Sequence, residues 1–217
     1  MNLKKLVTAA VCTMLMAAVA FTAGCGGEKK SDKKVLKVGM ECAYAPYNWS
    51  QTKADGGAVK IAGSNEYAYG YDVMMAKKLA DSMGADLEIH KIEWDGLAPA
   101  VVSGKIDAAI AGMSITSKRK ETVDFTKPYY YATVVALVKK DSEQAKAQSV
   151  ADLKGSVATS QLNTIWYDQI DQVPDVKKLP AIDTVPGMIV ALTSGKCNLI
   201  VTDIPTAKAC LLYTSPS

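Results

Sequence analysis

The sequence has few of the residues that metal centres and hydrolytic active sites use. Its 217 residues include a single histidine, His90, and 5 cysteines. A His/Cys metal cluster is therefore excluded, and a Ser-His-Asp triad would have to use that one ring. Leu87 and Ile89 alternate with polar residues up to His90, which predicts a strand with the imidazole on its solvated face.

The cysteines are too few for a disulfide framework. Cys12 and Cys25 lie near the N-terminus and Cys210 near the C-terminus, so only Cys42 and Cys197 belong to the body of the chain. Two thiols do not staple a fold, and burial as small apolar side chains is the role that their residue type favours.

The charge of the chain excludes another class of protein. Lys and Arg total 25 and Asp and Glu total 22, which gives a net charge of +3. Two of the cations, Lys4 and Lys5, lie in an N-terminal leader, so the body is almost neutral. Nucleic-acid binding needs a clustered positive field to displace counterions from phosphates, and the sequence has no basic stripe. With 49% apolar and 22% charged residues, the composition is instead typical of a globular protein.

The N-terminal segment has the pattern of an export signal. Lys4 and Lys5 precede the uncharged stretch 6–21, which is too short to span a bilayer comfortably. We therefore expect residues 1–24 to be a signal peptide.

A lipid anchor is expected directly after this signal peptide. Residues 22–25, Thr-Ala-Gly-Cys, resemble the lipobox of bacterial lipoproteins, although Thr22 stands where leucine is usual. We expect Cys25 to be acylated and residues 25–34, which are rich in glycine and charge, to form a flexible tether. The alternative is that Cys25 is simply a buried thiol of the leader.

The C-terminal residues 210–217, CLLYTSPS, resemble the translation of a sequencing-library adapter. No pattern before them predicts a terminal helix or strand, and we leave them out of the fold prediction. In this interpretation the natural chain continues beyond Ala209 and is truncated here. The alternative is a natural short tail.

The first half of the body alternates between strands and helices. The pattern predicts a strand over 35–40, a helix capped by Asp72, a strand over 87–92, a helix capped by Asp95 and an apolar strand over 106–111. The first helix should bury one face, which is made of Ala76, Leu79, Ala80 and Met83. This βαβαβ order predicts a parallel sheet whose last strand is buried on both faces. Residues 41–71 are predicted to be a loop.

A second α/β half follows the segment FTKPYYY at 125–131, which we interpret as a connection between two lobes. The predicted elements are a strand over 132–138, a turn over 152–155, a strand over 157–160, a helix from Thr164, a helix over 186–194 and a strand over 197–202. We place lobe 1 at 35–130 and lobe 2 at 131–209. Both lobes contain a helix-Ser-Gly-Lys-strand echo, which makes Gly112 and Asp203 equivalent strand ends. A ligand is then expected in the cleft at the carboxyl ends of both sheets.

Arg119 is the only arginine among the 25 basic residues. Its planar fork suits a carboxylate in a way that flexible lysines do not. Asp203, which ends an apolar strand, is the candidate partner for a cation. The bland alternatives are a surface arginine, helix caps at Ser114 and Thr116, and an N-cap at Asp203 before Pro205.

Several motifs together resemble the family 3 extracellular solute-binding proteins, which are the amino-acid-binding components of ABC importers. The matching stretches are Leu36-Lys37-Val38-Gly39, Tyr44-Ala45-Pro46-Tyr47, Gly70-Tyr71-Asp72-Val73, Trp94-Asp95-Gly96-Leu97, Lys105-Ile106-Asp107-Ala108, Ser114-Ile115-Thr116-Ser117-Lys118-Arg119 and Val123-Asp124-Phe125-Thr126. The resemblance covers residues 35 to 209. It implies a type II periplasmic-binding-protein fold, with two α/β lobes and a central cleft. It also implies that a C-terminal return segment completes lobe 1, so a chain truncated at Ala209 would leave that lobe incomplete.

The resemblance assigns each pole of an amino acid to particular residues. Arg119 should pair with the ligand carboxylate, helped by backbone N–H groups at the helix start at Thr164. Asp203 should meet the ammonium, together with the Gly112 carbonyl and the Ser114 hydroxyl.

The ligand side chain has implied partners too. Tyr44 and Trp94 should enclose it, with core packing as the alternative role of these aromatics. Glu41 stands where an acid recognises a cationic side chain, unless it is a solvated loop carboxylate. Asn163 departs from the glycine of many members, and Ala111-Gly112 from their serines.

The function implied is that of the extracytoplasmic, lipid-anchored binding protein of an ABC importer, which captures an amino acid by lobe closure and delivers it to a permease. No cofactor or metal, no enzymatic activity and a monomer are expected. Two alternatives remain, namely the sensor domain of a membrane receptor and an enzyme similar to cyclohexadienyl dehydratase, with Glu41 or Glu66 as its acid.

Overall fold

The computed structural model describes the backbone of residues 33–214 and the side chains of residues 33–210. The predicted signal peptide, Cys25 and its lipid, most of the tether and the end of the tail lie outside the described residues. The elements described below belong to one compact unit, Lys34–Ser217. Within the described part, no helix has the length and apolarity needed to cross a membrane.

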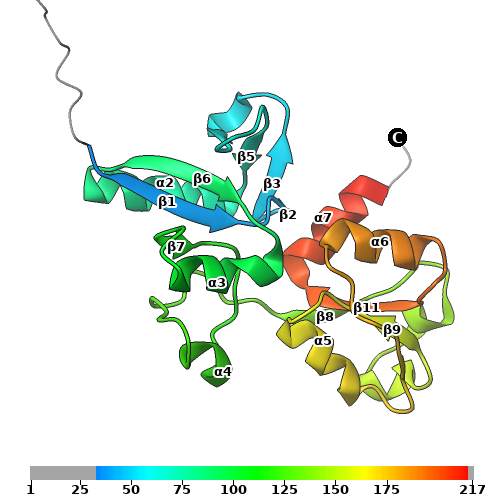
Figure 1. Ribbon diagram of the computed structural model, residues 1–217. Helices are drawn as coiled ribbons and strands as arrows, with labels where there is room; N and C mark the ends of the chain where they lie inside the picture. Colours follow the sequence, from blue (N-terminus) through cyan, green and yellow to red (C-terminus); the bar gives the residue numbers. More distant parts are fainter. Residues whose placement is uncertain (1–32, 215–217) are drawn as a thin grey trace, which may run out of the picture. The chain divides into compact units, whose positions relative to one another are not determined.

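The first half is built on a three-stranded parallel sheet, as predicted. Its strands are β1 (Val35–Met40), β6 (Asp86–Lys91) and β7 (Ala108–Ala109). β1 lies in the centre, in the order β6-β1-β7, and pairs Val38 with Ile89 on one side and with Ala108 on the other (Figure 1). The crossovers contain α2 (Tyr71–Met83), η2 (Trp94–Gly96) and α3 (Leu97–Val102). The carboxyl ends of the three strands therefore lie at one edge of the sheet.

The start of α2 differs from the prediction. Its N-cap is Gly70, at φ 129°, and Asp72 makes no capping hydrogen bond. A Cβ atom at position 70 would lie 2.3 Å from the Tyr47 carbonyl oxygen, so only glycine fits there. The Asp72 side chain turns instead toward Asn48 and Tyr129.

The buried face of α2 was predicted only in part. Ala76 and Ala80 are buried, but Leu79 is 39% and Met83 54% exposed. The buried stripe runs through Val73 instead, on a helix that packs against β6. Leu79 lies on the flank of the helix, at an open groove beside β7.

Strand β7 is shorter and more exposed than predicted. Ile106 and Ala111 are buried, but the paired residues between them are only half-buried. The reason is that β7 is the edge of the sheet and has a hydrogen-bonded neighbour on one side only.

The segment predicted as a loop contains a four-stranded antiparallel sheet in the order β2-β3-β5-β4. Its strands are β2 (Ala43–Tyr44), β3 (Asn48–Gln51), β4 (Val59–Lys60) and β5 (Tyr67–Tyr69), with η1 (Asp55–Gly57) between β3 and β4. Such short strands carry too little alternation to be recognised in a sequence. Trp49 and Tyr69 pack edge to face across β3 and β5.

The second half contains a four-stranded sheet in the order β10-β9-β11-β8. Its strands are β8 (Val134–Leu137), β9 (Val157–Thr159), β10 (Lys177–Lys178) and β11 (Leu199–Asp203), and β8 alone is antiparallel to its neighbour. The helices of this half are α5 (Ile165–Gln169), α6 (Val185–Thr193) and α7 (Ile204–Thr214), with η3 (Glu143–Lys146), η4 (Val150–Leu153) and η5 (Ile170–Gln172). The strands and helices predicted for this half occur near their predicted positions.

The end of the described chain is helical. α7 continues from Ile204 through Cys210, so the expectation that no helix extends into the tail was wrong. Asp203 caps this helix, and its first turn contains Pro205. The origin of residues 210–217 stays a prediction.

We predict that Gly70→Ala lowers the free energy of unfolding by about 3 kcal/mol, because position 70 combines a glycine-only backbone with a direct clash. Gly84→Ala is the matched control, since Gly84 is also left-handed, at φ 61°, but has open space around it. It should lower stability by about 1 kcal/mol. Urea unfolding of both variants provides the measurement, and equal losses would refute the steric argument.

Candidate functional site

Loops that follow strands of the β6-β1-β7 sheet and of the β10-β9-β11-β8 sheet meet at one narrow pocket. Most of the predicted site residues line it, joined by residues that the sequence analysis missed. The lining residues are Tyr44, Trp94, Gly112, Ser114, Arg119, Gln161, Thr164, Ile165 and Trp166. Glu41, Asn163 and Asp203 do not line this pocket, but each contacts one of its members. Gln161 follows β9 closely, so the strand-end rule that selected Asp203 would also have found it.

Arg119 is held by the backbone of both halves. It lies in the short helix α4 (Ser117–Lys120), whose N-cap is Thr116. The guanidinium Nη1 donates to the Ser114 carbonyl at 2.7 Å and Nη2 to the Asn163 carbonyl at 2.7 Å. Its carbon lies 5.4 Å from the centre of the Trp94 ring, within cation–π range. Thr116 thus has the alternative role of a helix cap, whereas the Ser114 carbonyl orients the guanidinium.

The charge of Arg119 is not neutralised by an ion pair. Across residues 33–210, no carboxylate lies within salt-bridge distance of the guanidinium. Burial lowers the pKa of Arg119, and the more distant Asp168 opposes this effect. The two carbonyls occupy two of its five N–H donors. A half-buried cation of this kind, facing a pocket, suits an anion.

Glu41 is a buried carboxylate between the two halves. It is 4% exposed, and the Gln161 amide donates to its oxygens at 3.0 and 3.2 Å. Burial raises the pKa of Glu41 to about 7; the Gln161 hydrogen bond opposes this and the charge of Glu93 adds to it. The alternative of a solvated loop carboxylate is therefore wrong.

Asp203 lies behind the pocket wall and is fully buried. The backbone N–H of Thr206 donates to Oδ1 at 2.9 Å, and its hydroxyl to Oδ2 at 3.1 Å. The Tyr44 hydroxyl donates to Oδ2 at 2.5 Å and the Tyr47 hydroxyl to Oδ1 at 3.4 Å. In this arrangement Asp203 has the alternative N-cap role and is screened from the pocket by Tyr44.

Gly112 and Tyr44 are in close contact. Gly112 has φ 62°, and a Cβ atom there would lie only 2.8 Å from the Tyr44 ring. A larger residue, such as serine, would displace the ring. The absence of a side chain at 112 thus lets Tyr44 reach Asp203.

Asn163 and Thr164 connect the pocket to its surroundings. Asn163, at φ 53°, donates from its amide to Asp95 at 2.9 Å. The Thr164 hydroxyl donates to the Gln161 carbonyl at 2.7 Å and accepts the Tyr167 N–H at 3.3 Å. The bonds of Asn163 and Gln161 cross between the halves, as does that between Tyr44 and Asp203, so the halves are in contact around the pocket.

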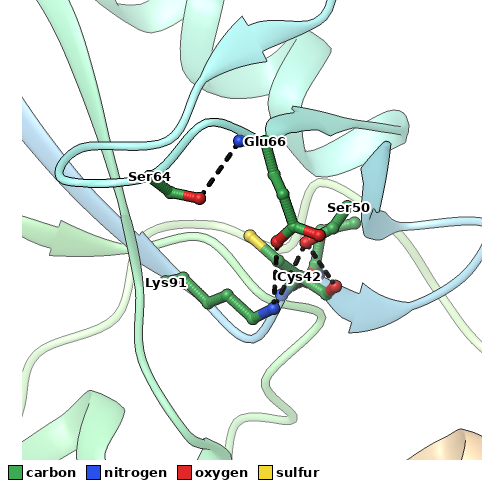
Figure 2. A network of polar contacts seen from close by, with 6 residues as sticks. Cys42, Ser50, Ser64, Glu66 and Lys91 are labelled. Carbon is green, nitrogen blue, oxygen red and sulfur yellow. Dashed lines mark hydrogen bonds and ion pairs between the residues drawn. The ribbon is translucent and has the colours of Figure 1, made fainter. Parts of the chain in front are cut away.

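A polar network joins Lys91 and Glu66 to Ser50 and to the backbone of Cys42 (Figure 2). Lys91 reaches Ser50 at 3.4 Å and Glu66 at 3.5 Å, and the Ser50 hydroxyl donates to the Cys42 carbonyl at 3.3 Å. Burial raises the pKa of the Cys42 thiol to about 12, so it packs as an inert apolar group. His90 Nε2 lies 2.6 Å from Glu88, and this ring stays partly exposed on β6.

Comparison with known proteins relates the chain to one family. The bacterial extracellular solute-binding proteins, family 3, match residues 36–179. A probable histidine-binding protein of Campylobacter jejuni is 31% identical over 81% of this chain and 62% of its own length. The arginine-binding protein 1 of an ABC transporter from Escherichia coli is 30% identical over 90% of this chain and 70% of its own length. The chain therefore spans less than two thirds of the Campylobacter protein.

Solved structures agree with this relation. The arginine-bound form of a truncated ArgBP from T. maritima superposes with a TM-score of 0.69 at 29% identity, covering 83% of this chain and 78% of that one. An ancestral amino-acid-binding protein, AncCDT-1, described as a precursor of cyclohexadienyl dehydratase, gives 0.70 at 31% identity, covering 82% and 74%.

We predict that Glu41→Gln stabilises the ligand-free protein at high pH only. The folded state binds a proton at Glu41 more readily than the unfolded state, whose pKa is near 4.5. Stability therefore falls as pH rises from about 4.5 to about 7, by roughly 3 kcal/mol in total, and the glutamine variant escapes this loss.

Urea unfolding at pH 4 and pH 8 measures the effect. The exposed Glu121→Gln is the control and should behave alike at both values. A Glu41→Gln difference that does not grow between pH 4 and pH 8 would contradict the burial argument.

Proposed function

Because the chain belongs to the bacterial extracellular solute-binding proteins of family 3, we propose that it captures an amino acid outside the cytoplasm and delivers it to the permease of an ABC importer. Its fold is that of the type II periplasmic binding proteins, with two α/β lobes. The relatives named above are amino-acid-binding proteins, and this supports an amino acid as the ligand class.

The unneutralised guanidinium of Arg119 is the observation that carries the proposal. Two carbonyl oxygens and the Trp94 ring orient it, while no described carboxylate pairs with it. The α-carboxylate of an amino acid is a planar anion of matching geometry. Thr164, which lies in the same pocket, adds polar groups at the start of α5.

The ligand ammonium is proposed to bind at Asp203, the Gly112 carbonyl and the Ser114 hydroxyl. Tyr44 donates to Asp203 in the described structure, so the ammonium takes the place of the Tyr44 hydroxyl when it binds. Thr206 keeps its two hydrogen bonds to Asp203 in both states. The freed Tyr44 ring then covers the ligand opposite Trp94.

A cationic side chain is the proposed specificity. Glu41 lies beside the pocket and its burial disfavours an unpaired negative charge. Three further acids, Glu93, Asp95 and Asp183, line a second hollow that shares Trp94 with the pocket. We propose L-arginine or a similar cationic amino acid, which agrees with the arginine-binding relatives.

Lobe closure follows from the cost of burying a zwitterion. Each ligand charge must gain a charged or multiply hydrogen-bonded partner to offset its lost hydration. Arg119 and Asp203 come from different halves, so both poles are satisfied only when the halves meet. Closure is thus linked to occupancy, and the permease can distinguish the filled form.

The position at the membrane remains part of the proposal. Members of the family are extracellular, as its description says. We propose that Cys25 carries the lipid that holds the protein to the outer face of the cell membrane and that the residues up to Lys34 form its tether.

An enzymatic role is the second candidate, because AncCDT-1 is described as a precursor of a dehydratase. Glu41, whose pKa is raised to about 7, has the protonation behaviour of a general acid. Glu66 does not suit this role, because it pairs with Lys91 away from the pocket. We favour binding, because AncCDT-1 itself is described as an amino-acid-binding protein.

We predict that Arg119→Lys weakens binding of L-arginine to the protein about 100-fold, because lysine keeps the charge but loses the fork. The exposed Lys120→Ala, on the same short helix, is the control and should bind like the wild type. Titration calorimetry after a screen of the twenty amino acids gives the affinities. Unchanged affinity in Arg119→Lys would remove Arg119 from the site.

We also predict that Glu41→Gln selectively weakens binding of cationic ligands. L-Arginine should lose at least about tenfold in affinity, whereas the neutral L-glutamine should lose much less, because only arginine brings a positive charge to Glu41. Calorimetry with both ligands gives the ratio of their dissociation constants. An unchanged ratio would show that Glu41 does not read side-chain charge.

A further inference from the structure

A continuous network of hydrogen bonds runs through the first half and ends at Gly112, which lines the pocket. The Cys42 N–H donates to Asn48 Oδ1 at 2.7 Å, and the Asn48 amide donates to Asp72 Oδ2 at 2.7 Å. The Tyr129 hydroxyl donates to Asp72 Oδ1 at 2.8 Å and accepts the Gly112 N–H at 2.9 Å. The network thus joins residues that are 70 positions apart in the sequence.

The centre of this network is completely enclosed. Asn48 and Asp72 are both 0% exposed, so neither can exchange its partners for water. Each carboxylate oxygen of Asp72 accepts from its own donor. The Asn48 side chain accepts through its oxygen and donates through its nitrogen. The Tyr129 phenol donates and accepts at once, which a phenylalanine ring cannot do. Loss of one member therefore leaves a polar group unpaired.

Both ends of the network enter loops of the site. Cys42 directly follows Glu41, and Gly112 lies two residues before Ser114, whose carbonyl holds Arg119. Both terminal residues have left-handed backbones, with φ 57° at Cys42 and 62° at Gly112. Their N–H groups are fixed by this hydrogen-bond network rather than by the pairing of a sheet. The network therefore sets the course of each loop.

Tyr129 also belongs to the connection between the halves. Its carbonyl accepts the Tyr71 hydroxyl at 3.1 Å, so the residue is fixed to α2 at both its backbone and its side chain. The next backbone bond of the connection joins the Thr133 carbonyl to Ile204 at 3.1 Å, in the second half. Tyr129 and the following Tyr130, whose ring packs against Tyr47 and Tyr71, thus hold this end of the connection to the first half.

We propose that Asp72 and Tyr129 are positioning residues for ligand binding, which hold the Glu41 loop and the Gly112–Ser114 loop in register and tie both to the connection between the halves. The inference rests on the proposed function, because it assigns ligand affinity to residues outside the pocket wall. Neither residue touches the ligand. They act through Gly112 and through the backbone at Cys42.

Tyr129→Phe tests the proposal with the loss of one oxygen atom. The affinity of the protein for L-arginine should fall about tenfold, because Gly112 and Asp72 each lose a partner. Tyr131→Phe is the matched control, since Tyr131 lies in the same connection and is 82% exposed. Its affinity should equal that of the wild type. The measurements are made well below the melting temperature, so a merely structural role would lower the melting temperature and leave the dissociation constant unchanged.

A double-mutant cycle with Asp72→Asn identifies the route of the effect. If Tyr129 acts through Asp72, the losses of affinity in the two single variants are not additive in the double variant. Additive losses would show that Tyr129 does not act through Asp72. An unchanged affinity in Tyr129→Phe, in a protein whose wild type binds, would overturn the whole inference.

Hydrogen exchange separates this inference from the proposed function. In the ligand-free protein the Gly112 amide should exchange faster in Tyr129→Phe than in Tyr131→Phe, because its acceptor is gone. Equal exchange rates would overturn the positioning role even where binding occurs. If the wild type binds none of the twenty amino acids, the proposed function fails, and the assignment of affinity to Tyr129 fails with it.

Discussion

A half-buried guanidinium that has only neutral partners is the constraint on which the site depends. Arg119 is held by one carbonyl from each half of the molecule and by the face of Trp94. Carbonyl oxygens orient a cation without cancelling its charge, and the charge acts strongly where water is partly excluded. An anion that enters this pocket therefore gains more than it would at an exposed lysine. Because Ser114 and Asn163 lie in different halves, the proposed anion site is complete only when the halves are in contact.

At the proposed ammonium site, Asp203, a ligand group has to replace an existing hydrogen-bond donor. Asp203 already has four donors, and it is fully buried. In the proposed function an ammonium group therefore binds there by replacing a hydroxyl, and the gain in free energy is the difference between the two interactions. Tyr44 is the partner best placed to leave, because Gly112 gives its ring room and the ring borders the pocket. In the proposed function, one side chain thus fills the site when it is empty and covers the ligand when it is occupied.

The sequence predicted the regular elements well where the local pattern was strong. β1 alternates clearly and was predicted to the residue, and the echo of Gly104 and Gly195 corresponds to left-handed glycines at φ 71° and 81°, each just after a helix. Six of the residues that line the pocket had been named from the resemblance to the family. The antiparallel sheet was missed because its strands have two to four residues.

The role of Asp72 was predicted wrongly for a more general reason. An aspartate in a first helical turn normally bonds the adjacent backbone, which is a local property that sequence can express. Here the carboxylate is buried against Tyr129, 57 positions away, and only the folded chain brings the two together. Asp72 therefore lies at the centre of the hydrogen-bond network with Asn48 and Tyr129 and does not cap the helix. Partners so distant leave no mark on the local pattern.

Glu41 shows how stability and function oppose each other in the proposed site. Burial disfavours its charge, so at neutral pH the empty closed form bears a free-energy cost that an apolar or amide side chain would avoid. A cationic ligand removes that cost by supplying the missing charge, and a neutral ligand does not. The same residue therefore weakens the empty closed form and favours the form filled by the correct ligand. A ligand shifts the equilibrium between the open and the closed form only by its difference in affinity for the two forms. In the proposed function, the cost at Glu41 in the empty closed form therefore makes closure selective for a cationic ligand.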